Sequence, residues 1–194
     1  MQFIDSLDEL AREPACVVLF SGGLDSSYTL WFCRENGIRA VALQALLGAE
    51  EPQEVEDAAR TAHDLGAELV TLDLTDELAE HFIPPAIRAG AEYCGAFPIC
   101  SSLTRPLIAE AAVRVARDRG INCVVHSATW VQNSSARFNN SFHVLAPDVR
   151  VGNPFAREPI DRAHKRTALR EAGIDFSARG LYSIDANIWG RVIE

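Results

Sequence analysis

The feature that most constrains this chain is a continuous apolar run, residues 16–20 (CVVLF), that leads directly into Ser21-Gly22-Gly23. A stretch with helical character, residues 26–36, follows, and Gly37 marks its end. A strand without polar alternation is buried on both faces, which is typical of a parallel sheet covered by helices. The sequence therefore predicts a strand, a glycine turn and a helix, with the turn at the carboxyl end of a buried strand.

The same alternation continues along the chain. We expect further strands at residues 39–46, 68–72, 123–126 and 144–149. We expect further helices at residues 52–65, 76–83, 104–119 and 160–172, with Pro84-Pro85 stopping the second and Pro106 in the first turn of the third. The polar segment 130–143 is expected to be a loop. This order predicts an α/β fold, a mainly parallel sheet flanked by helices.

The composition excludes several classes of protein. With 194 residues, 48% of them apolar, the chain is expected to form one domain around one core. No apolar run reaches the ~18 residues of a membrane span, and the N-terminus does not resemble a secretory signal. A formal net charge of −9 disfavours nucleic-acid binding. The five cysteines contain no CxxC pair, so we expect no zinc ribbon and a reducing, cytoplasmic location.

The turn at residues 21–27 has the chemistry of a phosphate-binding loop. A helix start presents unpaired N–H groups and a partial positive charge, and glycines let the backbone approach an anion. The residues expected to hold phosphates are Ser21, Gly22, Gly23, Asp25, Ser26 and Ser27. Asp25 would repel a phosphate unless a cation lies between them, so we expect ATP with Mg²⁺, and Asp25 as the metal ligand.

The turn differs from two other kinds of phosphate-binding loop. The chain contains no GxxxxGK[ST] motif and no GxGxxG after the first strand, which excludes a Walker-type loop and the dinucleotide fingerprint. A turn that merely needed glycine and a helix cap remains the structural alternative.

The string SGGLDS at residues 21–26 resembles the PP-loop of the N-type ATP pyrophosphatases. Members of that superfamily include argininosuccinate synthase, asparagine and GMP synthetases and tRNA thiolases. The resemblance implies an adenine nucleotide α-hydrolase-like, Rossmann-like fold. It also implies a shared chemistry, in which a substrate oxygen is adenylated by ATP, pyrophosphate leaves, and a nucleophile then displaces AMP.

Three further blocks resemble argininosuccinate synthase and occur in the order found in that family. They are residues 82–110, which contain SSLTRPLIAE; residues 126–138, with HSAT followed by Asn133 and Arg137-Phe138; and residues 182–194, YSIDANIWGRVIE. The resemblance implies that residues 1–194 form the nucleotide-binding domain of the family. Its C-terminal synthetase domain is expected to be absent, so a homodimer or a partner subunit would complete the site.

The resemblance also implies roles for individual residues. Asp25, Ser26 and Arg105 are the expected catalytic residues, and Ser127 joins the loop in binding ATP. The residues expected to bind an amino-acid-like substrate are Tyr93, Ser102, Thr129, Asn133, Arg137 and Ser183. Structural alternatives stay open: Tyr93 as a core aromatic, Arg105 as a helix-start contact, Ser183 as a turn residue. His126 is expected to pack rather than act as a base.

The chain departs from the family in the loop that binds aspartate. Ser134 replaces the acid of that loop and Val131 its lysine, while Ser127, Trp130 and Gln132 stand at glycine positions. Loss of a charged partner in a buried site weakens binding by about 2–5 kcal/mol, so aspartate binding as in the parent family is not expected.

Three functions follow as hypotheses. The first is an AMP- and pyrophosphate-forming carbon–nitrogen ligase that adenylates a small amino-acid-like substrate in specialised metabolism. The second is a catalytically inactive nucleotide-binding or regulatory protein. The third is a PP-loop sulfur-transfer enzyme that uses Cys94 or Cys100.

Overall fold

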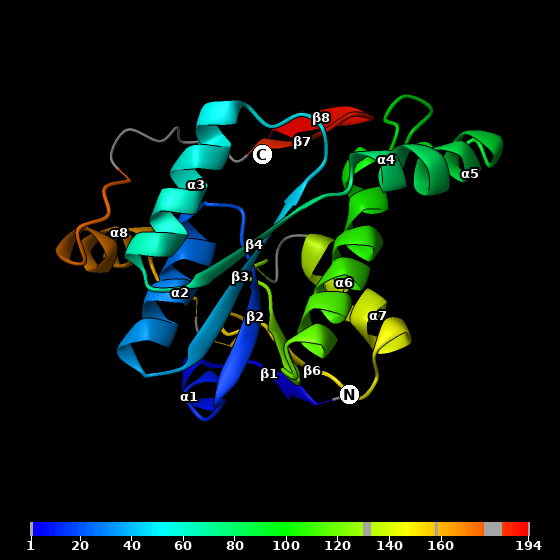
Figure 1. The fold of residues 1–194 in the computed structure, drawn as a ribbon. Coiled ribbons are helices and arrows are strands. Elements are labelled where there is room, and N and C mark those ends of the chain that lie inside the picture. The colour runs from blue at the N-terminus through cyan, green and yellow to red at the C-terminus, as the bar shows by residue number, and fades with distance from the viewer. Residues whose placement is uncertain (1, 130–132, 158, 177–183, 194) are drawn as a thin grey trace.

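The computed structural model describes residues 2–129, 133–157, 159–176 and 184–193, and its centre is a parallel sheet between two layers of helices (Figure 1). Six strands pair in parallel in the order β1-β6-β5-β2-β3-β4. Their bounds are β1 Phe3–Ile4, β2 Ala15–Leu19, β3 Arg39–Leu46, β4 Glu68–Asp73, β5 Cys123–Val125 and β6 Arg150–Gly152. The predicted α/β fold with a mainly parallel sheet is confirmed.

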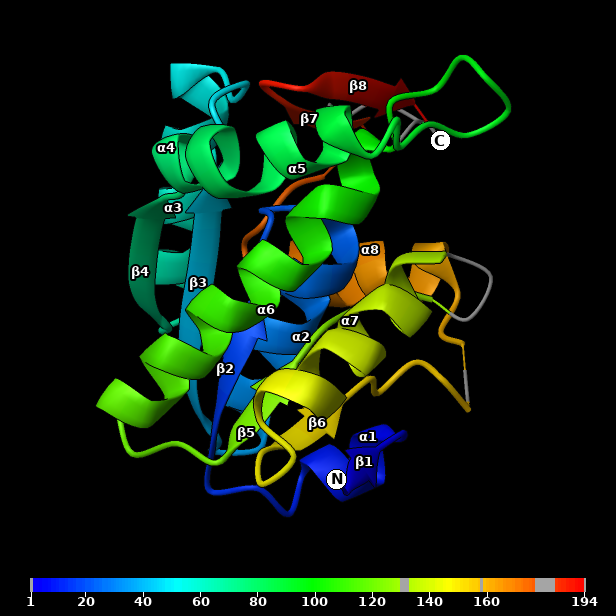
Figure 2. The ribbon, with the colours of Figure 1, turned by 90° about the vertical axis from the view of Figure 1, so that its right-hand side faces the viewer.

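The strand order explains which helices cover which face. From β2 the chain moves outward through β3 to β4, and it then returns through α6 (Cys100–Asp118) to β5 on the other side of β2. Because such crossovers are right-handed, the two directions place helices on opposite faces. One face carries α2 (Leu24–Glu35), α3 (Pro52–Asp64) and α8 (Arg162–Glu171), and the other carries α6 and α7 (Asn133–Leu145) (Figures 1 and 2).

An apolar core lies on each face of the sheet. Val18 of β2 packs in one core with Leu30 of α2. Its neighbour Val17 packs in the other core with Leu107 of α6 and Phe142 of α7. Successive side chains of a strand point to opposite faces, so β2 is buried on both, as its unbroken apolar sequence predicts.

The predicted loop at residues 130–143 is wrong over its described part, because residues 133–145 form α7. Phe138 and Phe142 lie four residues apart, both are buried, and their rings stack at 6.4 Å between centroids. Their burial outweighs the modest helix propensity of the surrounding Asn and Ser residues. The strand predicted at 144–149 is also wrong, since the helix continues to Leu145 and β6 begins at Arg150. Residues 130–132 lie outside the described residues.

The helix predicted at residues 76–83 does not end at Pro84-Pro85. A short helix, α4 (Thr75–Glu77), continues through a π-helical turn, η1 (Leu78–Phe82), into α5 (Ile83–Arg88). The prolines lie at the start of α5, where their missing N–H groups would have no partner within that helix.

Helix α6 begins four residues earlier than predicted, so Pro106 lies in its interior rather than in its first turn. The extra turn is supported by Asn187, whose side chain donates to the Cys100 carbonyl at 3.4 Å. Although α6 spans 19 residues, neither it nor another helix in the described part of the chain is apolar enough to cross a membrane.

Four further elements of the described structure were not predicted: β1, α1 (Leu7–Leu10), and the antiparallel hairpin of β7 (Ile184–Asn187) and β8 (Gly190–Ile193). The hairpin is fixed at the carboxyl edge of the sheet. The N–H of Ile188 donates to the Leu47 carbonyl at 3.0 Å, directly after β3. The indole N–H of Trp189 donates to the Pro98 carbonyl at 2.7 Å, just before α6.

Phe142→Ala should lower the free energy of unfolding by about 3–5 kcal/mol, because it removes a fully buried ring and leaves a cavity. Val144→Ala is the matched control on the same helix. Val144 is 79% exposed, so its loss should change the free energy by about 0.5 kcal/mol at most. Urea unfolding followed by circular dichroism measures both, and equal small effects would contradict a packed α7.

Candidate functional site

The strand order reverses between β2 and β5. These strands are neighbours, with Val18 paired to Val125, but the segments that follow them diverge: β2 leads to α2 on one face and β5 leads towards α7 on the other. In open parallel sheets, ligands bind at the carboxyl ends of the strands where the order reverses. The predicted phosphate loop follows β2, and the predicted site residues Ser127 and Thr129 follow β5, so both segments lie at this position.

The phosphate loop is shaped by its own serines. The Ser26 hydroxyl donates to the Gly23 carbonyl at 3.2 Å and accepts from the Ser21 N–H at 3.4 Å. The Ser21 hydroxyl accepts from the Gly23 N–H at 3.3 Å. Gly22 has φ of 71°, a left-handed conformation that side chains disfavour. The loop is thus a tight turn, closed by serine hydrogen bonds, that leads from β2 into the first turn of α2.

The loop residues fit an anion. The first N–H groups of α2 have no carbonyl of a preceding turn to bind, and the helix dipole favours a negative charge there. The Ser27 hydroxyl is buried without a hydrogen-bond partner in the described structure. A Cβ placed on Gly23 would lie 3.2 Å from the Ser21 hydroxyl, so the turn is tight at this position. These donors suit a phosphate chain such as that of ATP.

Asp25 has a partner that the sequence argument missed. The ammonium of Lys165, on α8, donates to the Asp25 carboxylate at 2.7 Å. The Lys165 side chain is only 4% exposed, and its ammonium also lies 3.8 Å from the centre of the Phe155 ring. A sequence signal was available, because Lys165 is the single lysine of a chain that otherwise uses arginine.

The ion pair between Lys165 and Asp25 involves the residue that was expected to bind Mg²⁺. Asp25 was expected to need a cation, and a protein cation already contacts it. Among the described residues, no three His, Cys, Asp or Glu side chains gather into a group that could hold a metal ion. The role of Asp25 as a Mg²⁺ ligand therefore stays a prediction.

Arg105 joins three segments of the site. It forms an ion pair with Asp185 of β7, and its Nε donates to the Ser134 hydroxyl in the first turn of α7 at 3.1 Å. Its guanidinium lies 5.5 Å from the centre of the Phe138 ring. Arg105 therefore ties α6 to α7 and to the C-terminal hairpin, and its catalytic role stays a prediction beside this structural one.

The predicted substrate-binding residues are distributed around these three segments. Ser102 lies in the first turn of α6, and Asn133 and Arg137 lie in the first turns of α7. Tyr93 is 68% exposed, which excludes the alternative of a core aromatic. Ser183 lies outside the described residues. Arg105 thus brings together the helix starts that carry Ser102, Asn133 and Arg137, whereas their roles towards a substrate stay predictions.

His126, at the end of β5, is fully buried. Its Nε2 forms a hydrogen bond with Asn139 at 2.9 Å, and its ring stacks on Phe138 at 5.3 Å between centroids. Burial lowers the pKa of His126 from 6.5 to about 4, although the bond to Asn139 partly opposes this shift. The imidazole is therefore neutral near pH 7.

The two cysteines of the sulfur-transfer hypothesis have different environments. Cys94 is exposed and has a left-handed backbone with φ of 55°. Cys100 is buried, and burial raises the pKa of its thiol. A buried thiol of raised pKa is a poor nucleophile, so Cys94 is the more suitable of the two.

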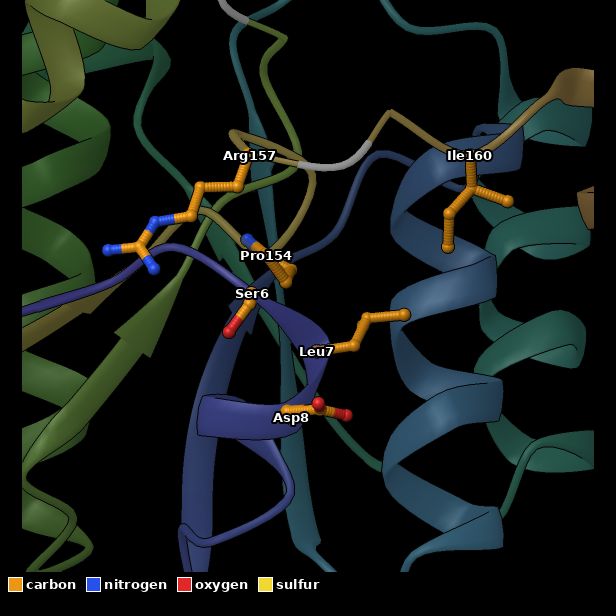
Figure 3. Close-up of a pocket in the computed structure, with 6 residues that line it drawn as sticks. All are labelled: Ser6, Leu7, Asp8, Pro154, Arg157 and Ile160. Carbon is orange, nitrogen blue, oxygen red and sulfur yellow. The ribbon is translucent and has the colours of Figure 1, made fainter.

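Two hollows elsewhere in the described part of the chain are lined by none of the predicted site residues. A cavity of about 220 Å³ is lined by residues of α1 and of the segment before α8, namely Ser6, Leu7, Asp8, Pro154, Arg157 and Ile160 (Figure 3). A groove between α6 and α7 is lined by Phe82, Pro106, Glu110, Asn140, Ser141, Val144 and Leu145. The candidate site is therefore defined by the strand ends and not by these two hollows.

A parallel sheet whose central strand, β2, leads through the SGGLDS turn into α2 has the architecture of an α/β domain of the PP-loop type. Comparison with known families then gives the particular family. The profile described as "Arginosuccinate synthase N-terminal HUP domain" matches residues 15–180, and the chain belongs to the argininosuccinate synthase family.

Similar proteins agree with this assignment. The argininosuccinate synthase of Rubrobacter xylanophilus is 37% identical over 181 residues, and that of Lacticaseibacillus paracasei is 32% identical over 186 residues. Each alignment covers 92% of this chain but 44% of the relative, so the chain spans less than half the length of these proteins.

Two solved structures share the fold. An NMN synthetase from Francisella tularensis has a TM-score of 0.59 at 14% identity, covering 87% of this chain and 68% of that one. A 4-thiouridine synthetase, described as an RNA complex with bound ATP, has a TM-score of 0.59 at 15% identity, covering 82% and 41%.

The pH dependence of stability should report the burial of His126. The unfolded chain binds a proton below pH 6.5, whereas the folded chain does so only near pH 4. The free energy of unfolding should therefore fall as the pH drops through this window, by up to about 1.4 kcal/mol per pH unit. His126→Gln should remove this contribution, and His63→Gln, at an exposed histidine, should not. Urea titrations at several pH values test this, and identical slopes for the wild type and His126→Gln would contradict it.

Proposed function

We propose that this chain binds ATP at residues 21–27 and is the nucleotide-binding part of a ligase resembling argininosuccinate synthase. The ligase adenylates a small amino-acid-like substrate, releases pyrophosphate, and passes the activated compound to a nitrogen nucleophile with release of AMP. The observation that carries this proposal is the position of the loop, at the helix start where the strand order reverses. Membership of the family supports the same assignment.

The loop would act mainly on the leaving group. When a substrate oxygen attacks the α-phosphorus, the bond to the bridging oxygen breaks and negative charge collects on pyrophosphate. N–H groups at the start of α2 and the unpartnered hydroxyl of Ser27 would stabilise that charge. Mg²⁺, where it accompanies the nucleotide, supplies further neutralisation of the phosphates.

The amino-acid-like substrate would bind where Arg105 gathers α6, α7 and the hairpin, close to Ser102, Asn133 and Arg137. Ser134 stands where the family resemblance places an acid, and its hydroxyl is occupied by Arg105. An acceptor other than aspartate, used in specialised metabolism, accounts for this change.

A second function has an observation in its favour. Arg105 is held by Asp185 and Asp25 by Lys165, so two of the predicted catalytic side chains already have charged partners. This arrangement suits a protein that binds nucleotide without turning it over. The sulfur-transfer hypothesis depends on Cys94, and Cys94→Ser would leave activity unchanged if it is incorrect.

A coupled assay of pyrophosphate release, run with ATP and a panel of amino acids and amines, separates these functions. The ligase predicts pyrophosphate and AMP in equal amounts with one substrate class. ATP binding without products would favour the regulatory protein, and production of ADP would contradict both.

Gly22→Ala and Gly37→Ala form a matched pair for the nucleotide site. Both glycines have positive φ, 71° and 67°, and they lie before and after α2. Each change should lower the free energy of unfolding by about 1–2 kcal/mol, because a Cβ strains a left-handed residue. Only Gly22→Ala should weaken ATP binding, by at least about tenfold, since it disturbs the N–H groups that face the phosphates. Calorimetric titration with ATP measures the difference, and equal affinities in the two variants would argue against the loop as the site.

A further inference from the structure

Lys165 is buried in a position where a charge is costly. Helix α8 packs on α2, and the residue is 3% exposed. Its ammonium lies between the Asp25 carboxylate, at 2.7 Å, and the rings of Phe155 and Tyr28, whose centres are 3.8 and 5.9 Å away. A buried charge needs compensation, and here it comes from one carboxylate and two aromatic faces.

An ion pair that only fastened α8 to α2 would not require lysine. Arginine forms two parallel hydrogen bonds with a carboxylate and stacks better on aromatic rings. At all other Lys or Arg positions this chain has arginine. An ammonium differs because its three N–H donors point in different directions. Asp25 takes one of them, and no second hydrogen-bond acceptor for this ammonium lies among the residues that the structure describes.

The ion pair lies beside the phosphate loop. Asp25 is in the first turn of α2, two residues after Gly23, and its side chain is 31% exposed. The ammonium that it holds is therefore next to the helix start at which an anion would bind. The Ser27 hydroxyl, buried and unpartnered, belongs to the same turn. An ammonium, an unpartnered hydroxyl and the first N–H groups of the helix therefore all lie at the N-terminal end of α2.

We propose that Lys165 is the phosphate-binding cation of this site and that Asp25 is its positioning residue. The inference rests on the proposed function, because it concerns the leaving pyrophosphate of the same nucleotide. Asp25 holds the ammonium at the loop before the nucleotide arrives. The remaining N–H donors of Lys165 then bind the β- and γ-phosphates, and the positive charge stabilises pyrophosphate as it leaves.

Calorimetric titration of the full chain with ATP, inorganic pyrophosphate and AMP tests this proposal. Lys165→Met should weaken binding of ATP and pyrophosphate by about 10- to 150-fold, the effect of losing a hydrogen bond from a charged group. Binding of AMP, which lacks both outer phosphates, should change much less. Arg162→Gln, which removes a positive charge from an exposed position on the same helix, should leave all three affinities unchanged.

A loss of stability must be separated from a loss of phosphate binding, because Lys165→Met leaves the Asp25 carboxylate without its partner. The double variant Asp25→Asn/Lys165→Met removes both charges, and thermal unfolding reports whether it folds. The proposal predicts that this folded double variant still binds ATP and pyrophosphate weakly, whereas a purely structural pair predicts recovery of the wild-type affinity.

The outcomes are distinct. If Lys165→Met and the double variant bind pyrophosphate as the wild type does, Lys165 is not the phosphate-binding cation, although the proposed function stands. If ATP, pyrophosphate and AMP all weaken equally in Lys165→Met, the pair is structural and this inference fails. If the wild type itself binds neither ATP nor pyrophosphate, the proposed function fails, and this inference fails with it.

Discussion

A helix that begins one short turn after a buried strand leaves its first N–H groups without helical partners at the carboxyl edge of the sheet, and the candidate site depends on this constraint. Here the strand is β2, buried on both faces, and the helix is α2. The strand cannot shift without disturbing both apolar cores, so the position of the turn is fixed by packing far from the site. Gly22 and the two serines that close the turn then set its shape.

Two ion pairs connect this turn and its surroundings to distant parts of the chain. Asp25 and Lys165 are 140 residues apart, and Arg105 and Asp185 are 80 residues apart. The first places α8 against the phosphate loop, and the second places the C-terminal hairpin against α6 and α7. In both pairs the cation is largely removed from water and its carboxylate partner is partly exposed, so losing the carboxylate would leave a buried charge without compensation. The local charge of the site is therefore organised by the fold, although the chain as a whole is strongly acidic.

The sequence predicted what depends on local pattern and missed what depends on tertiary contact. The strand at 39–46 and the helix at 52–65 follow periodicity and end signals, and the structure matches them within a residue. Helix α7 was missed because its Asn and Ser residues favour loops, whereas two buried phenylalanines decide its conformation. The glycine turn was predicted from its local sequence motif. The contact of Lys165 with Asp25 was not predicted, because no local pattern encodes a contact between residues 140 positions apart. Only the rarity of lysine in this sequence pointed to that residue.

The most direct test of this account is a crystal structure of the protein with an ATP analogue that cannot be cleaved between its α- and β-phosphates. The account predicts the β- and γ-phosphates at the start of α2, with N–H groups of residues 24–26 as donors. It would be contradicted by an analogue bound elsewhere on the molecule at full occupancy, with the turn after β2 empty.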